Sequence, residues 1–206
     1  MNKKVGIFFV AAGAVLMCAA LCFFLHNKNV EKEAQRSVES IVPKVASVIA
    51  AAQADDTTTD GYTLWAVEEH ILKTKELVEV EIDGHGYVGV ISFPALSLEL
   101  PVMADWNDEK LSISPCRFSG NVASEDLVIM AHNYTKHFGK IGTLAEGAEV
   151  LFTDMEGKTT RYEVVVLDVL AATDVEDMTA GEYDLTLFTC NYSGKSRITL
   201  RCDEVQ

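Results

Sequence analysis

The segment Leu185-Thr186-Leu187-Phe188-Thr189-Cys190 alternates β-forming residues and ends on a thiol. This pattern predicts a strand that carries one cysteine at its tip. The next five residues, Asn191-Tyr192-Ser193-Gly194-Lys195, are typical of a turn, and Arg197 then opens a second apolar run over residues 196–200. The sequence therefore predicts a hairpin whose two strands present a thiol and a guanidinium at the same end.

A third polar residue follows another predicted strand. The apolar run Leu127–Ala131 ends on His132 and Asn133. A cysteine combined with a histidine elsewhere in the chain is typical of a nucleophile and its acid/base partner. Each residue alone has a structural explanation: Cys190 would be a buried thiol, His132 would lie at the rim of the fold and Arg197 would be a surface charge. Their order along the chain, taken together, favours a catalytic site.

The rest of the C-terminal region predicts a mostly β fold. Short strands recur at close spacing with few helices between them, which indicates a closed or nearly closed β-barrel of about eight strands. A helical turn with an Asp cap is expected over 174–179. The predicted strands upstream of the hairpin cover residues 87–92, 96–100, 111–114, 127–131, 149–153 and 161–170.

The N-terminus predicts a membrane anchor. Residues 5–25 are apolar or small without a charge, which is long enough to span a bilayer, and Lys3 and Lys4 precede them. This asymmetry favours a cytoplasmic tail and an uncleaved signal anchor over 1–27, rather than a cleaved signal peptide. The remainder would lie outside the cell as an acidic domain, with 31 acidic residues against 15 basic ones once the two lysines are removed.

Between anchor and barrel we expect a juxtamembrane stalk and linker over 28–62, and a catalytic domain over 63–206. The stalk has helical composition across 29–53 but contains Pro43, which should kink or end a helix. A flexible linker is expected over 55–61. Residues 64–77 suggest a short amphipathic helix, and packing against the barrel is favoured over a lid above a groove.

The charge and the number of cysteines limit which classes of function are compatible with the sequence. An acidic domain without a basic patch has no electrostatic reason to bind nucleic acid. Three cysteines lie beyond the anchor, so at least one thiol there is free. With Cys190 taken as the reactive thiol, Cys116 and Cys202 either form a disulfide or are two small buried residues. No metal-binding spacing accompanies His137, for which a surface or packing role is expected; we predict no metal and no cofactor.

The T-L-F-T-C strand, the His after an earlier strand and the Arg opening the following strand together resemble the sortases, the membrane-anchored cysteine transpeptidases of bacterial surfaces. The resemblance covers roughly residues 87–202 and the anchor. It implies that Cys190 is the nucleophile, His132 the acid/base and Arg197 the oxyanion or substrate-carbonyl ligand. Thr189 and Asn133 are further candidates for substrate binding.

The same resemblance implies a substrate and a partner. The substrate would be a C-terminal sorting signal of the LPXTG type on a surface protein, cleaved before its Gly. The acceptor would be an amine of a peptidoglycan precursor or of a pilin. The short gap between Cys190 and Arg197 looks nearest to class B-like enzymes. The sequence shows neither the N-terminal lid with an Asp-Pro-aromatic anchor nor the second, C-terminal membrane helix of pilin-polymerising sortases, which favours the anchoring of single proteins.

The sequence is also compatible with two alternatives. An L,D-transpeptidase would also use an extracytoplasmic cysteine on cell-wall peptides, although its cysteine typically lies in a Ser-His-Gly-Cys-Arg-like run, whereas Cys190 precedes Asn191 and Tyr192. The other is a membrane-tethered β-barrel binding module in which Cys190 is structural.

Overall fold

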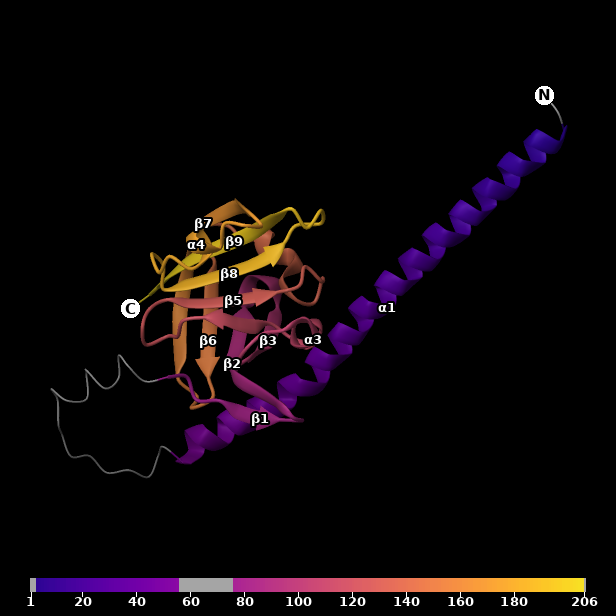
Figure 1. Cartoon of the computed structure of the whole chain (residues 1–206). Coiled ribbons are helices and arrows are strands. Elements are labelled where there is room, and N and C mark those ends of the chain that lie inside the picture. The colour runs from indigo at the N-terminus through magenta and orange to yellow at the C-terminus, as the bar shows by residue number, and fades with distance from the viewer. Residues whose placement is uncertain (1–2, 56–75, 206) are drawn as a thin grey trace, which may run out of the picture.

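A β-barrel and one long helix make up the computed structural model, which describes residues 3–55 and 76–205 (Figure 1). The sheet order is β1-β2-β3-β4-β5-β8-β9-β7-β6, and pairing of β2 with β6 closes β2 to β9 into an eight-stranded barrel. The predicted barrel is therefore confirmed. The strands are β1 (Val80–Ile82), β2 (His85–Phe93), β3 (Leu98–Met103), β4 (Cys116–Ser119), β5 (Leu127–Ala131), β6 (Glu149–Asp154), β7 (Thr159–Ala171), β8 (Leu185–Cys190) and β9 (Ser196–Glu204).

The barrel wall separates two sets of side chains. Along β8, Leu185 and Leu187 belong to the interior core, whereas Phe188 belongs to a small cluster with Val128 and Met178. Because successive side chains of a strand point to opposite faces, this second cluster lies on the outer face of the barrel. Cys190 continues the outward-facing set of β8.

Parallel pairing between β5 and β8 decides where the polar strand ends meet. The two strands run in register from Leu127 opposite Leu185 to Ala131 opposite Thr189. Parallel neighbours end at the same edge of a sheet. The residue that follows β5 and the last residue of β8 therefore lie side by side, although they are far apart in the sequence.

The long helix α1 (Lys3–Asp55) runs beside the barrel and then extends well beyond it (Figure 1). Its C-terminal half buries a stripe of apolar side chains at helical spacing against β2, β3 and a short helix. The expected stalk is thus largely a packed part of the folded unit. The buried residues of this stripe are Ala34, Val38, Ile41, Val45 and Ile49.

Of the two effects predicted for Pro43, a kink or a helix end, the helix end is wrong, because α1 continues through it. A proline inside a helix costs roughly 3 kcal/mol through a lost hydrogen bond and a clash with the preceding turn. Ile41 and Val45 are buried against the barrel on either side of Pro43. Burial of such side chains contributes about 1.5–3 kcal/mol each, which is enough to offset that cost.

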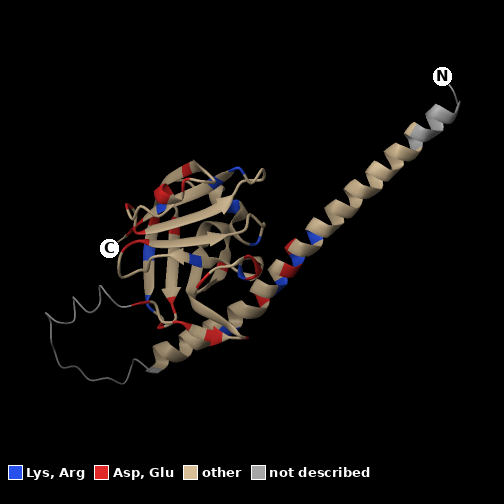
Figure 2. Cartoon of the chain, viewed as in Figure 1, with Lys and Arg blue, Asp and Glu red and all other residues tan. Residues whose placement is uncertain are grey.

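The N-terminal half of α1 is a candidate membrane anchor. Among the described residues, α1 is the helix that is long and apolar enough to cross a bilayer. The large apolar side chains exposed in this half are Phe9, Val15, Leu16, Met17, Leu21, Phe23, Phe24 and Leu25. Figure 2 shows this half without acidic or basic residues in its described part, and charges begin where the helix approaches the barrel. The first of these is Lys28, which lies over the ring of Phe24.

Two local expectations differ from the structure. The strand expected over 111–114 is wrong, because helix α3 (Asp108–Ile113) occupies this region. Asn107 caps it by accepting the amide of Lys110 at 2.8 Å. The expected turn over 174–179 is confirmed as α4 (Val175–Met178), but the carboxylate of Asp174 accepts the amide of Ala171 instead of capping the helix.

The possible disulfide between Cys116 and Cys202 is not formed. Cys116 and Cys202 are both buried as free thiols. Cys202 points into the barrel core, whereas Cys116 packs in the cluster between the outer wall, α1 and α3. Side chains on opposite faces of one sheet cannot be bridged. The expected linker over 55–61 and helix over 64–77 fall almost entirely outside the described residues.

Candidate active site

Cys190 and Arg197 come together through the β8–β9 hairpin. They are direct partners in the antiparallel ladder, at its last register position before the turn. Directly opposed residues lie on the same face of a sheet with Cβ atoms about 4.5–5.5 Å apart. The turn is held by the amide of Asn191, which donates to the carbonyl of Ser196 at 2.9 Å. The half-buried Cys190 thus has a guanidinium-bearing neighbour fixed by the backbone.

His132 reaches the same place through the parallel pair β5–β8. It follows Ala131 directly, and Ala131 is paired with Thr189. The hydroxyl of Thr189 donates to the carbonyl of Ala131 at 2.8 Å, which ties the two strand ends together one residue before His132 and Cys190. His132 therefore follows the strand next to that of Cys190, at the same edge of the sheet.

A cavity of about 320 Å³ joins the three predicted residues, since Cys190, His132 and Arg197 all line it. Its remaining wall is largely apolar and aromatic. The ring of Phe118 lies 5.7 Å from that of Trp106 and 5.4 Å from that of Phe188. The other lining residues are Asp108, Leu111, Met130, Ala131, Ala172, Val175, Met178 and Thr189. The site thus combines a thiol, an imidazole and a guanidinium with a surface suited to an apolar chain segment.

The environment of His132 favours its neutral form. Burial lowers the pKa of the imidazole below its ordinary value, and the carboxylate of Asp108 opposes this shift. A mostly neutral imidazole at neutral pH can accept a proton from a thiol or an amine. Asp108 lines the cavity at the first turn of α3, so it is the anionic group that acts on this histidine.

Of the two arginines near the end of the chain, Arg197 is the one that lines the cavity. Its guanidinium Nη1 donates to the carbonyl of Gly194 in the hairpin turn at 3.2 Å. Arg201 is only 6% exposed and donates to the hydroxyl of Thr186 at 3.2 Å and to the carbonyl of Asp177 at 2.7 Å. Arg201 therefore has a structural role, in which it links β9 to β8 and to α4 on the outer face of the barrel.

The two candidate substrate-binding residues occupy different places. Thr189 lines the cavity, but it is buried and its hydroxyl is engaged with Ala131. Asn133 is half-buried and does not belong to the cavity lining that the described residues form. Its carbonyl oxygen lies where Gly139 approaches the backbone closely, since a Cβ on Gly139 would come within 2.5 Å of it. We infer that Asn133 belongs to the loop architecture.

Of the two roles expected for His137, surface or packing, its complete burial agrees with packing. Its ring packs 5.3 Å from that of Tyr134, which in turn lies 4.8 Å from the ring of His132. Neither ring nitrogen makes a hydrogen bond of full geometry among the described residues, although the backbone of Ile113 interacts with the ring. Burial, followed by repulsion from His132, lowers the pKa of His137 to about 4, against a weak opposing effect of the backbone at Ile113.

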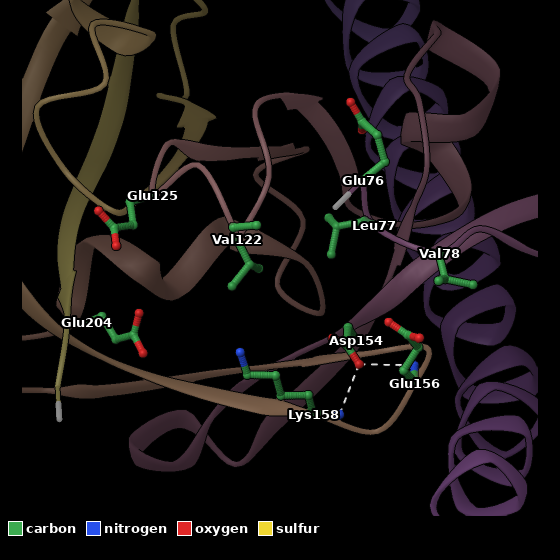
Figure 3. Close-up of a pocket in the computed structure, with 10 residues that line it drawn as sticks. Glu76, Leu77, Val78, Val122, Glu125, Asp154, Glu156, Lys158 and Glu204 are labelled. Atoms are coloured by element: carbon green, nitrogen blue, oxygen red, sulfur yellow. Dashed lines mark hydrogen bonds between the residues drawn. The ribbon is translucent and has the colours of Figure 1, made fainter. Parts of the chain in front are cut away.

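A second cavity lies elsewhere on the barrel and is rich in carboxylates. Figure 3 shows Glu125 and Glu204 on one side of it and Glu76 and Glu156 on the other. The carboxylate of Asp154 accepts two amides of its own turn. In the part of the chain that the structure describes, no group of three or more His, Cys, Asp or Glu side chains is arranged to hold a metal ion.

Sequence reasoning missed most of the cavity wall. Trp106 and Asp108 come from the connection between β3 and β4, and Val175 and Met178 come from the connection between β7 and β8. The cap Asn107 followed by Asp108 and Glu109 was the signal that could have identified α3.

Comparison with known proteins places the barrel in one family. The family model described as "Sortase domain" matches residues 91–205, which is more than half of the chain. "Sortase A" of Bacillus anthracis is 29% identical over 125 residues, a match that covers 56% of this chain and 57% of that protein. The chain thus spans less than two thirds of this curated relative.

Solved structures share the fold at low identity. Sortase A from Corynebacterium diphtheriae, in a lid mutant, superposes with a TM-score of 0.54 at 19% identity, over 80% of this chain and 95% of that chain. Sortase C1 from Streptococcus agalactiae gives a TM-score of 0.55 at 18% identity, over 87% and 97% respectively. These named proteins are sortases A and C, so the narrower class B-like affiliation stays a prediction.

Proposed function

The chain belongs to the sortase family, and on that premise we propose that it is a membrane-anchored cysteine transpeptidase that attaches surface proteins to an amine. The observation that carries the proposal is the single cavity lined by Cys190, His132 and Arg197. The family assignment disfavours the L,D-transpeptidase alternative. The pairing of the thiol with an imidazole and a guanidinium argues against a purely structural Cys190.

In the first half of the reaction, the sulfur of Cys190 attacks the carbonyl carbon of the peptide bond before the Gly of the sorting signal. The neutral imidazole of His132 accepts the thiol proton as the C–S bond forms. Collapse of the tetrahedral intermediate breaks the C–N bond, and protonated His132 donates its proton to the departing amine. The N-terminal part of the substrate is left as a thioester on Cys190.

In the second half, an acceptor amine enters the position that the leaving amine has vacated. His132 removes a proton from the amine as its nitrogen attacks the thioester carbon. Collapse of the second tetrahedral intermediate releases the thiolate of Cys190, which regains the proton from His132. The acceptor would be an amine of a peptidoglycan precursor or of a pilin.

Arg197 is suited to the negative charge that develops on the carbonyl oxygen. Its charge is permanent, and its donors are rigidly forked. Its position opposite Cys190 in the ladder, on the same face of the sheet, supports this role. Loss of one such donor typically costs roughly 10²–10³ in rate.

The apolar wall of the cavity would hold the hydrophobic part of the sorting signal. Phe118, Phe188, Val175 and Met178 provide a surface on which apolar side chains are removed from water. Binding there would place the scissile bond next to Cys190. The exposed apolar half of α1 would tether the enzyme as a single-pass protein with its barrel outside the cell.

The direct test uses the full chain in detergent or a nanodisc, because part of α1 is packed on the barrel. The protein is incubated with a pool of LPXTG-type peptides and with an amine acceptor, and the products are identified by mass spectrometry. We expect cleavage between Thr and Gly and a new amide to the acceptor. Absence of both products with every peptide would contradict the proposal.

A further inference from the structure

The membrane helix touches the loop that carries the imidazole of the site. The carboxylate of Glu31 in α1 accepts the backbone amide of Thr135 at 3.0 Å. Thr135 lies three residues after His132 and 104 residues after Glu31. The hydroxyl of Thr135, and then this amide, lower the pKa of Glu31 below its ordinary value, so the carboxylate is ionised at neutral pH.

The loop between His132 and Gly139 is tightly braced from within. The carbonyl of His132 accepts the amide of Phe138 at 3.1 Å, and the carbonyl of Tyr134 accepts the amides of His137 and Gly139 at 2.9 and 3.0 Å. A Cβ on Gly139 would come within 2.7 Å of the Tyr134 carbonyl oxygen. The amide of Thr135, in contrast, donates its hydrogen bond to Glu31 of helix α1.

The contact lies next to the aromatic ring that packs against the imidazole. The ring of Tyr134 packs 4.8 Å from that of His132 and precedes Thr135 directly. Burial raises the pKa of Tyr134, and the negative charge of Glu31 raises it further. A shift of the Thr135 backbone would therefore move Tyr134 and, with it, the surface on which His132 rests.

Helix geometry links this contact to the membrane. Glu31 lies six residues beyond Leu25, the last residue of the predicted span, and a helix rises about 1.5 Å per residue, so the two are about 9 Å apart along the axis. Three residues after Glu31, Ala34 begins the buried stripe that fixes α1 to the barrel. The loop that carries His132 is thus attached to the first extramembrane turns of the anchor helix.

We propose that Glu31 is a positioning residue, through which the anchor helix holds the loop that carries His132 in its working conformation. The inference rests on the proposed function of His132, but the hydrogen bond itself does not depend on it. The helix in this account is part of the catalytic unit as well as a tether.

The test compares Glu31→Ala, Glu31→Gln and the control Glu33→Ala, all as full chains in nanodiscs. Glu33 is an exposed carboxylate on the same helix, two residues further on. Hydrogen exchange of the Thr135 amide, resolved by fragmentation mass spectrometry, reports the contact without any substrate. Turnover of a sorting-signal peptide reports its consequence.

A hydrogen bond to an ionised acceptor that is partly exposed suggests roughly threefold to tenfold faster exchange of Thr135 in Glu31→Ala. We expect kcat to fall by a similar factor with little change in KM, because the loop positions His132 and does not bind the peptide. Glu31→Gln keeps an acceptor oxygen and should lie between Glu31→Ala and the parent. Glu33→Ala should match the parent in both measurements.

Unchanged Thr135 exchange in Glu31→Ala would overturn the proposal, as would an equal loss of kcat in Glu33→Ala. Faster exchange with an unchanged kcat would also overturn it, because the contact would then be structural only. A parent that is inactive on every peptide would instead contradict the proposed function, and the exchange data would still show whether the contact exists.

Discussion

Cys190 and Arg197 are direct partners across the β8–β9 ladder, at the last register position before the hairpin turn. The backbone hydrogen bonds of the two strands therefore set the separation of their Cα atoms. His132 is placed by a second ladder, the parallel pair β5–β8. The backbone of Cys190 and of Arg197 thus belongs to the sheet, whereas His132 lies in the loop that follows β5.

The three cysteines of the barrel should differ in reactivity. Cys190 lines the cavity, whereas Cys116 and Cys202 are fully buried, and burial raises the pKa of each of these two thiols to about 12. Iodoacetamide should therefore modify Cys190 in the native protein and the other two only after unfolding. Peptide mapping by mass spectrometry measures this. Native labelling of Cys202 as fast as that of Cys190 would rule out the assignment.

Replacing His132 with Ala should reduce kcat by roughly 10²–10⁴-fold, because the site loses the group that carries the proton between thiol and amine. His85→Ala is a matched control, since His85 begins β2 and does not line the cavity. Steady-state kinetics with a sorting-signal peptide gives both values. Comparable losses in the two variants would show that the imidazole has been misassigned.

Arg197 and Arg201 should separate function from stability. Arg197→Lys should lower kcat about 10²-fold and leave thermal unfolding near that of the parent. Arg201→Met should lower the free energy of unfolding by about 2–3 kcal/mol, because it removes two buried hydrogen bonds and leaves Asp168 without its ion pair. Calorimetry and peptide turnover on both variants test these two expectations. A loss of stability in Arg197→Lys together with a loss of kcat at unchanged stability in Arg201→Met would contradict them.

His137 should make the barrel sensitive to acid. Its pKa is about 4 in the native state against an ordinary 6.5, so the unfolded chain binds the additional proton in this pH window. Stability should therefore fall as the pH drops from about 6.5 towards 4, by up to about 3 kcal/mol. Denaturant unfolding of the parent and of His137→Leu measures this. A variant that shows the same pH slope as the parent would exclude His137 as the cause.

The alternating strands are a local pattern, so the sequence was sufficient to predict the barrel. It also singled out three residues that the structure brings to one cavity, while their catalytic roles stay predictions. Alternation in residues 185–190 and the turn that follows determine the β8–β9 hairpin. The same rule failed at Leu111 and Ile113, where an alternating pattern suggested a strand. The cap at Asn107 and the acidic first turn favour a helix there, and this helix forms.

The cavity wall and the role of α1 could not be predicted, because they depend on long-range packing. The stacking of Trp106 on Phe118 depends on the parallel pairing of β3 with β4, which brings the two residues together. The contact between Glu31 and Thr135 joins residues 104 positions apart, and no local pattern specifies it. Likewise, Pro43 signals a helix break, which packing of its flanks on the barrel overrides.

The central claim is that Cys190 forms a thioester with the N-terminal part of a sorting signal. The full chain in a nanodisc, mixed with an LPXTG-type peptide and quenched in acid before an amine is added, should gain the mass of the peptide fragment ending at Thr. Peptide mapping should place that mass on Cys190. An acceptor amine added before the quench, or hydroxylamine at neutral pH added after it, should remove the mass. An adduct absent from the parent, or present to the same extent in Cys190→Ala, would contradict the account.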